Sequence, residues 1–147
     1  MSVPGKDRNK PLVVLDTNIL VSYLWGSAHC CRIVRAMLLE NRFTPVITPG
    51  MIEEFDAVIS RPNIKRRIGE LAPAIFRREY LLFAHITFPG KELSVCDDPD
   101  DNMLLECANS AGAGYIVTGD DDLLRLKKFE KTRIVTPLEF IDTFLDR

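Results

Sequence analysis

The stretch Leu12-Val13-Val14-Leu15-Asp16-Thr17-Asn18 decides how this chain folds. Its four consecutive apolar residues, two of them β-branched, predict a strand buried on both faces, as in a parallel sheet. The run stops at Asp16, and Thr17-Asn18 then offers capping groups to a helix. A carboxylate is thereby placed at the carboxyl end of a central strand, the edge where open α/β sheets bind their ligands. Taken alone, the stretch favours the simpler interpretation that Asp16 only caps the helix.

Length and composition predict one ordinary globular domain. The chain has 147 residues, of which 46% are apolar and 27% charged. This is enough for a substantial hydrophobic core, and the sequence shows no internal repeat and no linker to a second domain. We expect residues 1–11 to form a loose polar lead-in and residues 12–147 to form the domain.

Charge and cysteine usage narrow the classes of function. The net charge is −2, so no overall basic field draws the protein to nucleic acid, although local basic patches can still do so. The four cysteines have neither Cys-x-x-Cys nor zinc-like spacing, which indicates reduced thiols. The polar start of the chain does not resemble a signal peptide, and no apolar run reaches membrane-spanning length. We therefore expect a soluble, cytoplasmic protein with no membrane partner.

Strands and helices are predicted to alternate along the chain. The expected strands are 12–15, 44–48, 86–88, 115–118 and 133–136. The expected helices follow Asp16 and then cover 31–41, 49–59, 64–71, 73–84, 101–111, 123–126 and 137–145. This alternation predicts an α/β fold, a three-layer sandwich around a central, mainly parallel sheet.

Acidic residues gather at the predicted strand ends and helix starts. Seven Asp residues fall between Asp97 and Asp122, and Glu54 lies on the helix after the second strand. Asp16 and Asp120 follow two strands that we expect to end at the same sheet edge. Carboxylates that converge repel one another unless a cation lies between them, and oxygen ligands without His or Cys suit Mg²⁺ or Mn²⁺.

Each acidic motif also has a purely structural interpretation. Asp and Glu at helix starts complement the helix dipole, and Asp-Pro-Asp-Asp at 98–101 is a common loop and cap composition. The run 120–122 is compatible with a solvated turn. The topology outweighs these interpretations, because three of the four acidic groups are expected at one edge of one sheet.

At this point the sequence resembles the PIN-domain nucleases, in particular the bacterial and archaeal (VapC-like) branch of toxins from toxin–antitoxin pairs. The matching stretches, in order, are Val14–Asn18, Thr48–Phe55 with Ser60–Pro62, Asp98–Asn102 with Glu106–Ala108, Tyr115–Asp120 with Leu123-Leu124, and Ile134–Pro137 with Glu139-Phe140. The likeness extends from about Pro11 to Leu145. The first stretch alone is weak evidence for this resemblance, but the whole set of stretches, in order and at suitable spacing, is strong evidence.

The resemblance implies an acidic site that binds Mg²⁺ or Mn²⁺ and cuts RNA internally by metal-activated water. The four catalytic acids of the family fall on Asp16, Glu54, Asp101 and Asp120. Asp16, Asp101 and Asp120 are then the main metal ligands, and Glu54 holds a metal or orients the water. Auxiliary ligands fall on Asp98 and Asp122, and the groups expected to orient the carboxylates are Asn18 and Thr118.

RNA must be held by basic side chains, because an acidic site repels its backbone. The candidates are Lys65, Arg66, Arg67, Arg77 and Arg78, although each one alone is more simply interpreted as part of a solvated helix face. An antitoxin protein and a second copy of the chain are further candidate partners, but no stretch identifies either. One alternative is a PIN-fold binding module with weak or absent catalysis. A lower-ranked alternative is a haloacid-dehalogenase-like phosphatase, but that class has a second Asp at the position that Asn18 occupies here.

Overall fold

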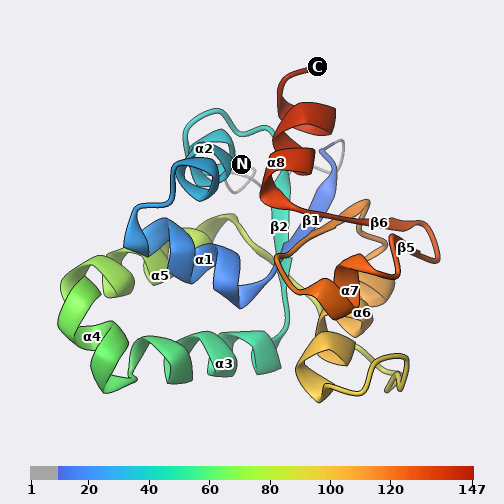
Figure 1. Cartoon of the computed structure of the whole chain (residues 1–147), viewed down its shortest axis with the longest axis horizontal. Coiled ribbons are helices and arrows are strands. Elements are labelled where there is room, and N and C mark those ends of the chain that lie inside the picture. The colour runs from blue at the N-terminus through green and yellow to red at the C-terminus, as the bar shows by residue number, and fades with distance from the viewer. Residues whose placement is uncertain (1–9) are drawn as a thin grey trace.

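The computed structural model describes residues 10–147, and the predicted lead-in therefore lies largely outside the described residues. Six strands form one sheet in the order β3-β2-β1-β4-β6-β5. All neighbouring strands are parallel except β5 and β6, which are antiparallel. Figure 1 shows the strands between helices, so the predicted α/β sandwich with a mainly parallel sheet is confirmed.

The strand that begins the chain's fold is central, as its sequence predicts. β1 (Leu12–Leu15) lies between β2 (Thr44–Ile47) and β4 (Tyr115–Val117). Val13, Val14 and Leu15 are fully buried. The pairing of β1 with β4 continues one residue past the strand, where the Asp16 N–H donates to the carbonyl of Val117 over 3.0 Å. Asp16 is therefore fixed against the end of the neighbouring strand.

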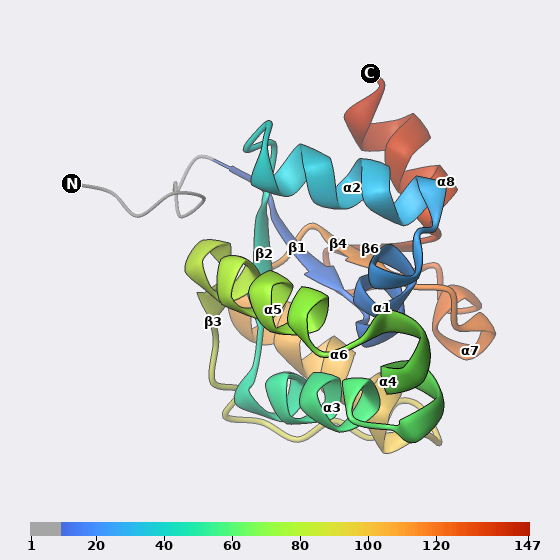
Figure 2. The ribbon, with the colours of Figure 1, turned by 90° about the vertical axis from the view of Figure 1, so that its left-hand side faces the viewer.

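Helices cover both faces of the sheet. Figure 2 looks onto the side that carries α1 (Thr17–Trp25), α2 (Ala28–Leu38), α3 (Pro49–Ile59) and α5 (Leu71–Phe83). The short helix α4 (Pro62–Ile68) joins α3 to α5. On the other face α6 (Pro99–Ala111) packs across β1, β2 and β4. Between residues 10 and 147, no helix is long and apolar enough to span a bilayer.

Five helices begin two or three residues earlier than their hydrophobic spacing predicts. Two of them are α6, which begins at Pro99 instead of Asp101, and α7 (Asp121–Leu124), which begins at Asp121 instead of Leu123. α2 begins at Ala28 instead of Cys31, because the Ser27 hydroxyl accepts from the Cys30 N–H and caps it. α4 begins at Pro62 and α5 at Leu71, although residues 64 and 73 were the predicted starts. In each case the first two residues are exposed, and apolar periodicity carries little information there.

The carboxyl-terminal part contains a strand that hydrophobic patterning misses. After α7 (Asp121–Leu124) comes the two-residue strand β5 (Lys128–Phe129), which pairs with β6 (Thr132–Val135). β5 has too few residues for an alternating pattern, and one of its two residues is a lysine. β3 is equally short, covering His85–Ile86. The last helix, α8 (Pro137–Phe140), continues into a π-helical segment (Ile141–Leu145).

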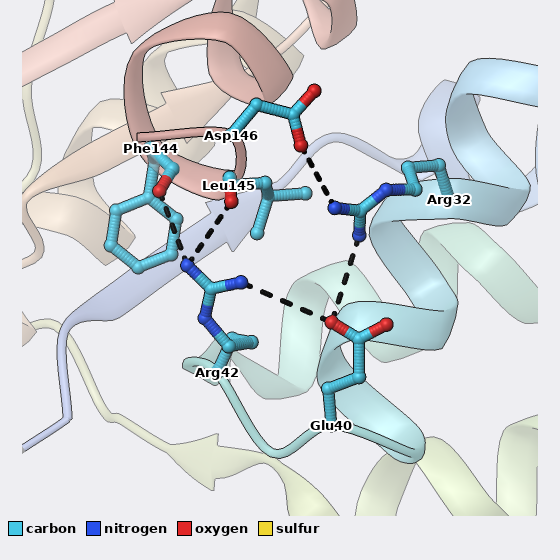
Figure 3. A network of polar contacts seen from close by, with 6 residues as sticks. All are labelled: Arg32, Glu40, Arg42, Phe144, Leu145 and Asp146. Atoms are coloured by element: carbon cyan, nitrogen blue, oxygen red, sulfur yellow. Dashed lines mark hydrogen bonds and ion pairs between the residues drawn. The ribbon is translucent and has the colours of Figure 1, made fainter.

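Aromatic packing and a polar network attach this last segment to the domain. Phe140 is fully buried, and its ring centre lies 5.5 Å from that of Phe43 and 5.3 Å from that of Tyr115. At the surface, Arg32 on α2 pairs with Asp146 over 3.0 Å, and Arg42 donates to the carbonyls of residues 144 and 145 (Figure 3). The network is partly exposed, so we expect the buried rings to contribute most of the stability.

We predict that Phe140→Ala costs about 3–5 kcal/mol of unfolding free energy, as deletion of a buried aromatic ring does. Asp146→Ala, which removes only an exposed ion pair, should cost less than about 1 kcal/mol. Urea unfolding followed by circular dichroism measures both values. Equal losses in the two variants would contradict the view that the aromatic contacts hold this segment.

Candidate functional site

The first acid is held by hydrogen bonds from neighbouring elements. The Asp16 side chain follows β1 and is only 7% exposed. Its Oδ2 accepts from the Thr118 hydroxyl over 2.7 Å, and its Oδ1 accepts from the Asn18 N–H over 3.3 Å. Burial raises the pKa of Asp16, and these two hydrogen bonds partly counter that rise. Asp16 therefore caps α1, as the simpler interpretation expected, and also lies at the sheet edge.

Three further acids come close enough together to hold one metal ion. Asp101, Asp120 and Asp122 each offer a carboxylate oxygen, and these three atoms lie within 4.8 Å of one another. We call these three residues the acidic cluster. Asp101 comes from the first turn of α6, while Asp120 caps α7 by accepting from the Asp122 N–H over 2.9 Å. The cluster thus brings together the starts of α6 and α7, two helices that are separated in the sequence by β4.

Asp101 is the buried member of the cluster, and its pKa is strongly raised. Its side chain is 4% exposed, and its Oδ2 has no hydrogen-bond partner among the described residues. Burial, together with the hydrogen bond and negative charge of Asp120, raises the pKa of Asp101 to about 7. Asp98 and Asp16 add smaller contributions in the same direction. A buried carboxyl group near two others is stable when protonated or when it binds a cation.

Glu54 approaches the same edge from α3. Its side chain is partly buried, whereas that of the neighbouring Glu53 is exposed. Burial raises the pKa of Glu54, and the negative charges of Asp100, Asp16 and Asp98 raise it further, while a side-chain hydrogen bond with Thr17 lowers it. These interactions place Glu54 within electrostatic range of the acids on α1 and α6. The sequence predicted Thr17 only as a capping group and not as a partner of Glu54.

The donor set fits a hard divalent cation. All three members of the acidic cluster offer carboxylate oxygens, and the unpartnered Oδ2 of Asp101 is a buried acceptor available to an ion. Neither histidine is part of it, as both His29 and His85 are exposed and belong to other elements. Carboxylate-only sites favour Mg²⁺ or Mn²⁺ over softer metals.

The other residues predicted for the site are Asp98, Asn18, Asp122 and Thr118, and they differ in burial and in their contacts. Asp98 is exposed and caps α6 by accepting from the Asp100 N–H over 2.9 Å. Asn18 contributes its backbone N–H to Asp16, and its side chain is exposed. Asp122, predicted as auxiliary, belongs to the tight group of three in which Asp16 is not included. Thr118 lies where an orienting group was expected and is fully buried.

Asn102 holds the loop in front of the acidic cluster, a role that its sequence position does not reveal. Its Oδ1 accepts from the N–H groups of Val95 and Cys96 over 3.0 and 2.7 Å, and its Nδ2 donates to the carbonyl of Cys96 over 2.8 Å. The loop is thereby clamped to α6 beside Asp101. An amide directly after an acid at a helix start is the only signal that the sequence offers.

The predicted basic residues lie on α4 and α5, and several are engaged elsewhere. Lys65 pairs with Glu70 over 2.9 Å, and Arg77 makes two hydrogen bonds to Asp56. The guanidinium of Arg67 lies 4.2 Å from the centre of the Trp25 ring. Arg66 donates to a backbone carbonyl of its own helix, and Arg78 is exposed. None of these contacts brings a basic group to the acidic cluster.

We predict that metal-free wild-type protein loses stability as pH rises from about 4 to about 7. The ordinary pKa of an aspartate is 3.8 and that of folded Asp101 is about 7, so the folded state binds more protons than the unfolded state in this interval. Asp101→Asn should remove this penalty, stabilising the protein at pH 8 by on the order of 2 kcal/mol relative to wild type, with little gain at pH 4.

Thermal unfolding in EDTA at several pH values measures this effect, with the exposed Asp121→Asn as the matched control. Added Mn²⁺ should raise the melting temperature of wild type at pH 8 and raise that of Asp101→Asn much less, because an ion that binds only the folded state stabilises it. Identical pH profiles for wild type and Asp101→Asn would contradict the assigned electrostatics.

Comparison with known proteins identifies the family. A family model described as PIN domain matches residues 12–122, which includes every strand and helix from β1 to the start of α7. No curated protein matched the chain. The match spans most of the chain and includes Asp16, Glu54 and the acidic cluster. The chain therefore belongs to the PIN-domain family, whose fold is that of nucleases that are typically metal-dependent.

Proposed function

We propose that this protein is an endoribonuclease that uses Mg²⁺ or Mn²⁺ and hydrolyses phosphodiester bonds with water as the nucleophile. The observation that carries the proposal is the buried Asp101 carboxylate, which has an unpartnered oxygen and lies against Asp120 and Asp122. In a PIN fold, a group of carboxylates that is costly without a cation supports a metal-dependent phosphodiesterase.

Each acid has a role that its surroundings support. Asp101, Asp120 and Asp122 would hold the ion, and Asp16 would complete the site from β1, kept in place by Thr118. When bound, the ion supplies Lewis-acid activation of water and neutralises charge that develops on the phosphate. Glu54, whose pKa is raised by burial and by neighbouring acids, would orient the water or accept its proton.

The nucleophile is assigned to water because, among the described residues, neither histidine lies on an element that carries a proposed acid. Cleavage through the ribose 2′-hydroxyl generally relies on side chains such as histidine that exchange protons near neutral pH. His29 lies in the first turn of α2 and His85 begins β3, and both are exposed. Neither belongs to an element that carries one of the four proposed acids, so the carboxylates remain the groups available for catalysis.

We predict that Mn²⁺ or Mg²⁺ supports cleavage of single-stranded RNA into fragments with 5′-phosphate and 3′-hydroxyl ends. EDTA should abolish the reaction, and Asp101→Asn or Asp16→Asn should lower it by at least about a hundredfold, as expected when a metal ligand is lost. Mass spectrometry of the fragment ends is the measurement, with Asp121→Asn as the control. Cyclic 2′,3′-phosphate ends, or undiminished cleavage in EDTA, would refute the mechanism.

We also propose that the nuclease acts as the toxin of a toxin–antitoxin pair. The support is the ordered set of motifs that resembles this branch, together with a sequence pattern in which none of the four expected acids is missing. Unchecked cleavage of cellular RNA stops protein synthesis and therefore growth.

Induced expression in a bacterial host without the rest of the locus should arrest growth, while expression of Asp101→Asn at the same level should not. Growth curves and viable counts provide the measurement, with immunoblots to equalise the amount of protein. Normal growth under wild-type expression, with Mn²⁺-dependent cleavage retained by the purified protein, would reject the toxin role and leave the nuclease assignment intact.

A further inference from the structure

Basic residues are concentrated in one short segment that the predicted site does not include. Residues 125–133 contain five basic side chains and one acidic side chain, in a chain whose net charge is −2. The basic residues are Arg125, Lys127, Lys128, Lys131 and Arg133, and the acid is Glu130. We call this segment the basic hairpin, because it includes β5 and the first two residues of β6, which pair with each other.

The basic hairpin leads directly away from the acidic cluster. Asp120 and Asp122 lie at the start of α7, and Arg125 follows the end of that helix. The guanidinium of Arg125 pairs with Asp122 over 3.0 Å, which links the first basic side chain to the cluster itself. The chain then crosses the edge of the sheet as β5 and returns along β6, beside α7 (Figure 1).

The backbone of the basic hairpin presents its charges outward. All five basic residues are exposed. Lys128 is the register partner of Arg133, and Arg133 that of Tyr115, so these three side chains share one face of the sheet. The Arg133 guanidinium lies 5.9 Å from the centre of the Tyr115 ring. Lys127 has a left-handed backbone with φ 61°.

Most of these charges are not neutralised by the protein. Apart from Arg125, the basic residues of the hairpin make no ion pair with any other described residue in 10–147. By contrast, Lys65 and Arg77 on α4 and α5 have acidic partners. α4 also lies on the opposite side of the molecule from α7 in Figure 1. The hairpin is thus a line of positive charge that starts beside the cluster at Arg125 and makes no ion pair with the described residues beyond it.

We infer that single-stranded RNA binds along the basic hairpin as it leaves the acidic cluster. This inference rests on the proposed nuclease function and assigns its substrate-binding surface. Phosphates are repelled by the acids, so affinity must come from cations placed next to them. A single strand is required because Asp101 is 4% exposed and a flexible backbone reaches such a recessed carboxylate more easily than a stiff duplex does.

The test compares two triple variants with the same change in charge. K127Q/K128Q/K131Q removes three charges from the hairpin and leaves Arg125 and Arg133, which contact Asp122 and Tyr115, in place. K65Q/R66Q/R78Q removes three charges from α4 and α5. Binding of a fluorescent single-stranded oligoribonucleotide is measured by anisotropy in EDTA, where no cleavage occurs, over a range of salt concentrations. Circular dichroism and melting temperatures show that each variant is folded.

The hairpin variant should bind RNA at least about tenfold more weakly at low salt, and its log–log salt dependence should fall by about two units, as expected for three lost contacts to a single strand. The α4–α5 variant should stay within about twofold of wild type. Equal binding by wild type and the hairpin variant, or a larger loss in the α4–α5 variant, would overturn the inference.

A second measurement separates this inference from the nuclease proposal. With Mn²⁺, the hairpin variant should hydrolyse the small diester bis(p-nitrophenyl) phosphate as fast as wild type, because this substrate is too small to reach the hairpin. A loss of this activity equal to the loss of RNA binding would mean that the hairpin supports the site and not the substrate. If wild type cleaves neither substrate, the nuclease proposal fails, and the metal-free binding comparison still decides the role of the hairpin.

Discussion

A single buried hydroxyl group fixes the geometry on which the candidate site depends. The Thr118 Oγ1 donates to Asp16 Oδ2 over 2.7 Å and accepts from the Asp120 N–H over 3.0 Å. It therefore joins the end of β1, the end of β4 and the start of α7. A hydroxyl can donate and accept at once, which neither an apolar nor a purely accepting side chain of similar size can do. Because Thr118 is fully buried, both bonds are shielded from water.

This arrangement keeps together groups that repel one another. The acids of the cluster lie within 4.8 Å, and the resulting cost is visible in the pKa of Asp101, which is raised to about 7. The sheet offsets that cost, since the register of β1 with β4 is set by buried apolar residues such as Val14 and Ile116. The hydrophobic core stabilises the fold, and part of that stability offsets the repulsion among the acids at the sheet edge.

The sequence predicted those features that depend on local pattern. The apolar run at 12–15 and the Ile-Val-Thr run at 116–118 predicted two central strands. Because Asp16 and Asp120 follow these strands, both acids were expected at the same edge of the sheet. Contacts between residues that lie apart in the sequence were harder to predict. Asp122 joins the cluster because α7 begins at Asp121, and Asn102 clamps a loop through three hydrogen bonds that no periodicity encodes. β5 was missed because two residues cannot show an alternating pattern.

Net charge concealed the most informative electrostatic feature of the chain. A value of −2 indicates neither attraction to nor exclusion from nucleic acid, yet the chain contains both an acidic sheet edge and a basic hairpin, which adjoin at α7. The carboxylates repel the phosphates of RNA, and a bound ion attracts only the phosphate next to it, so attraction for the rest of the strand must come from separate basic residues. In the inferred arrangement, the acids hold the ion and the hairpin holds the RNA. Because Arg125–Asp122 is the only ion pair between the two sets in residues 10–147, we expect the surface that binds substrate to change without altering the geometry of the site that cuts it.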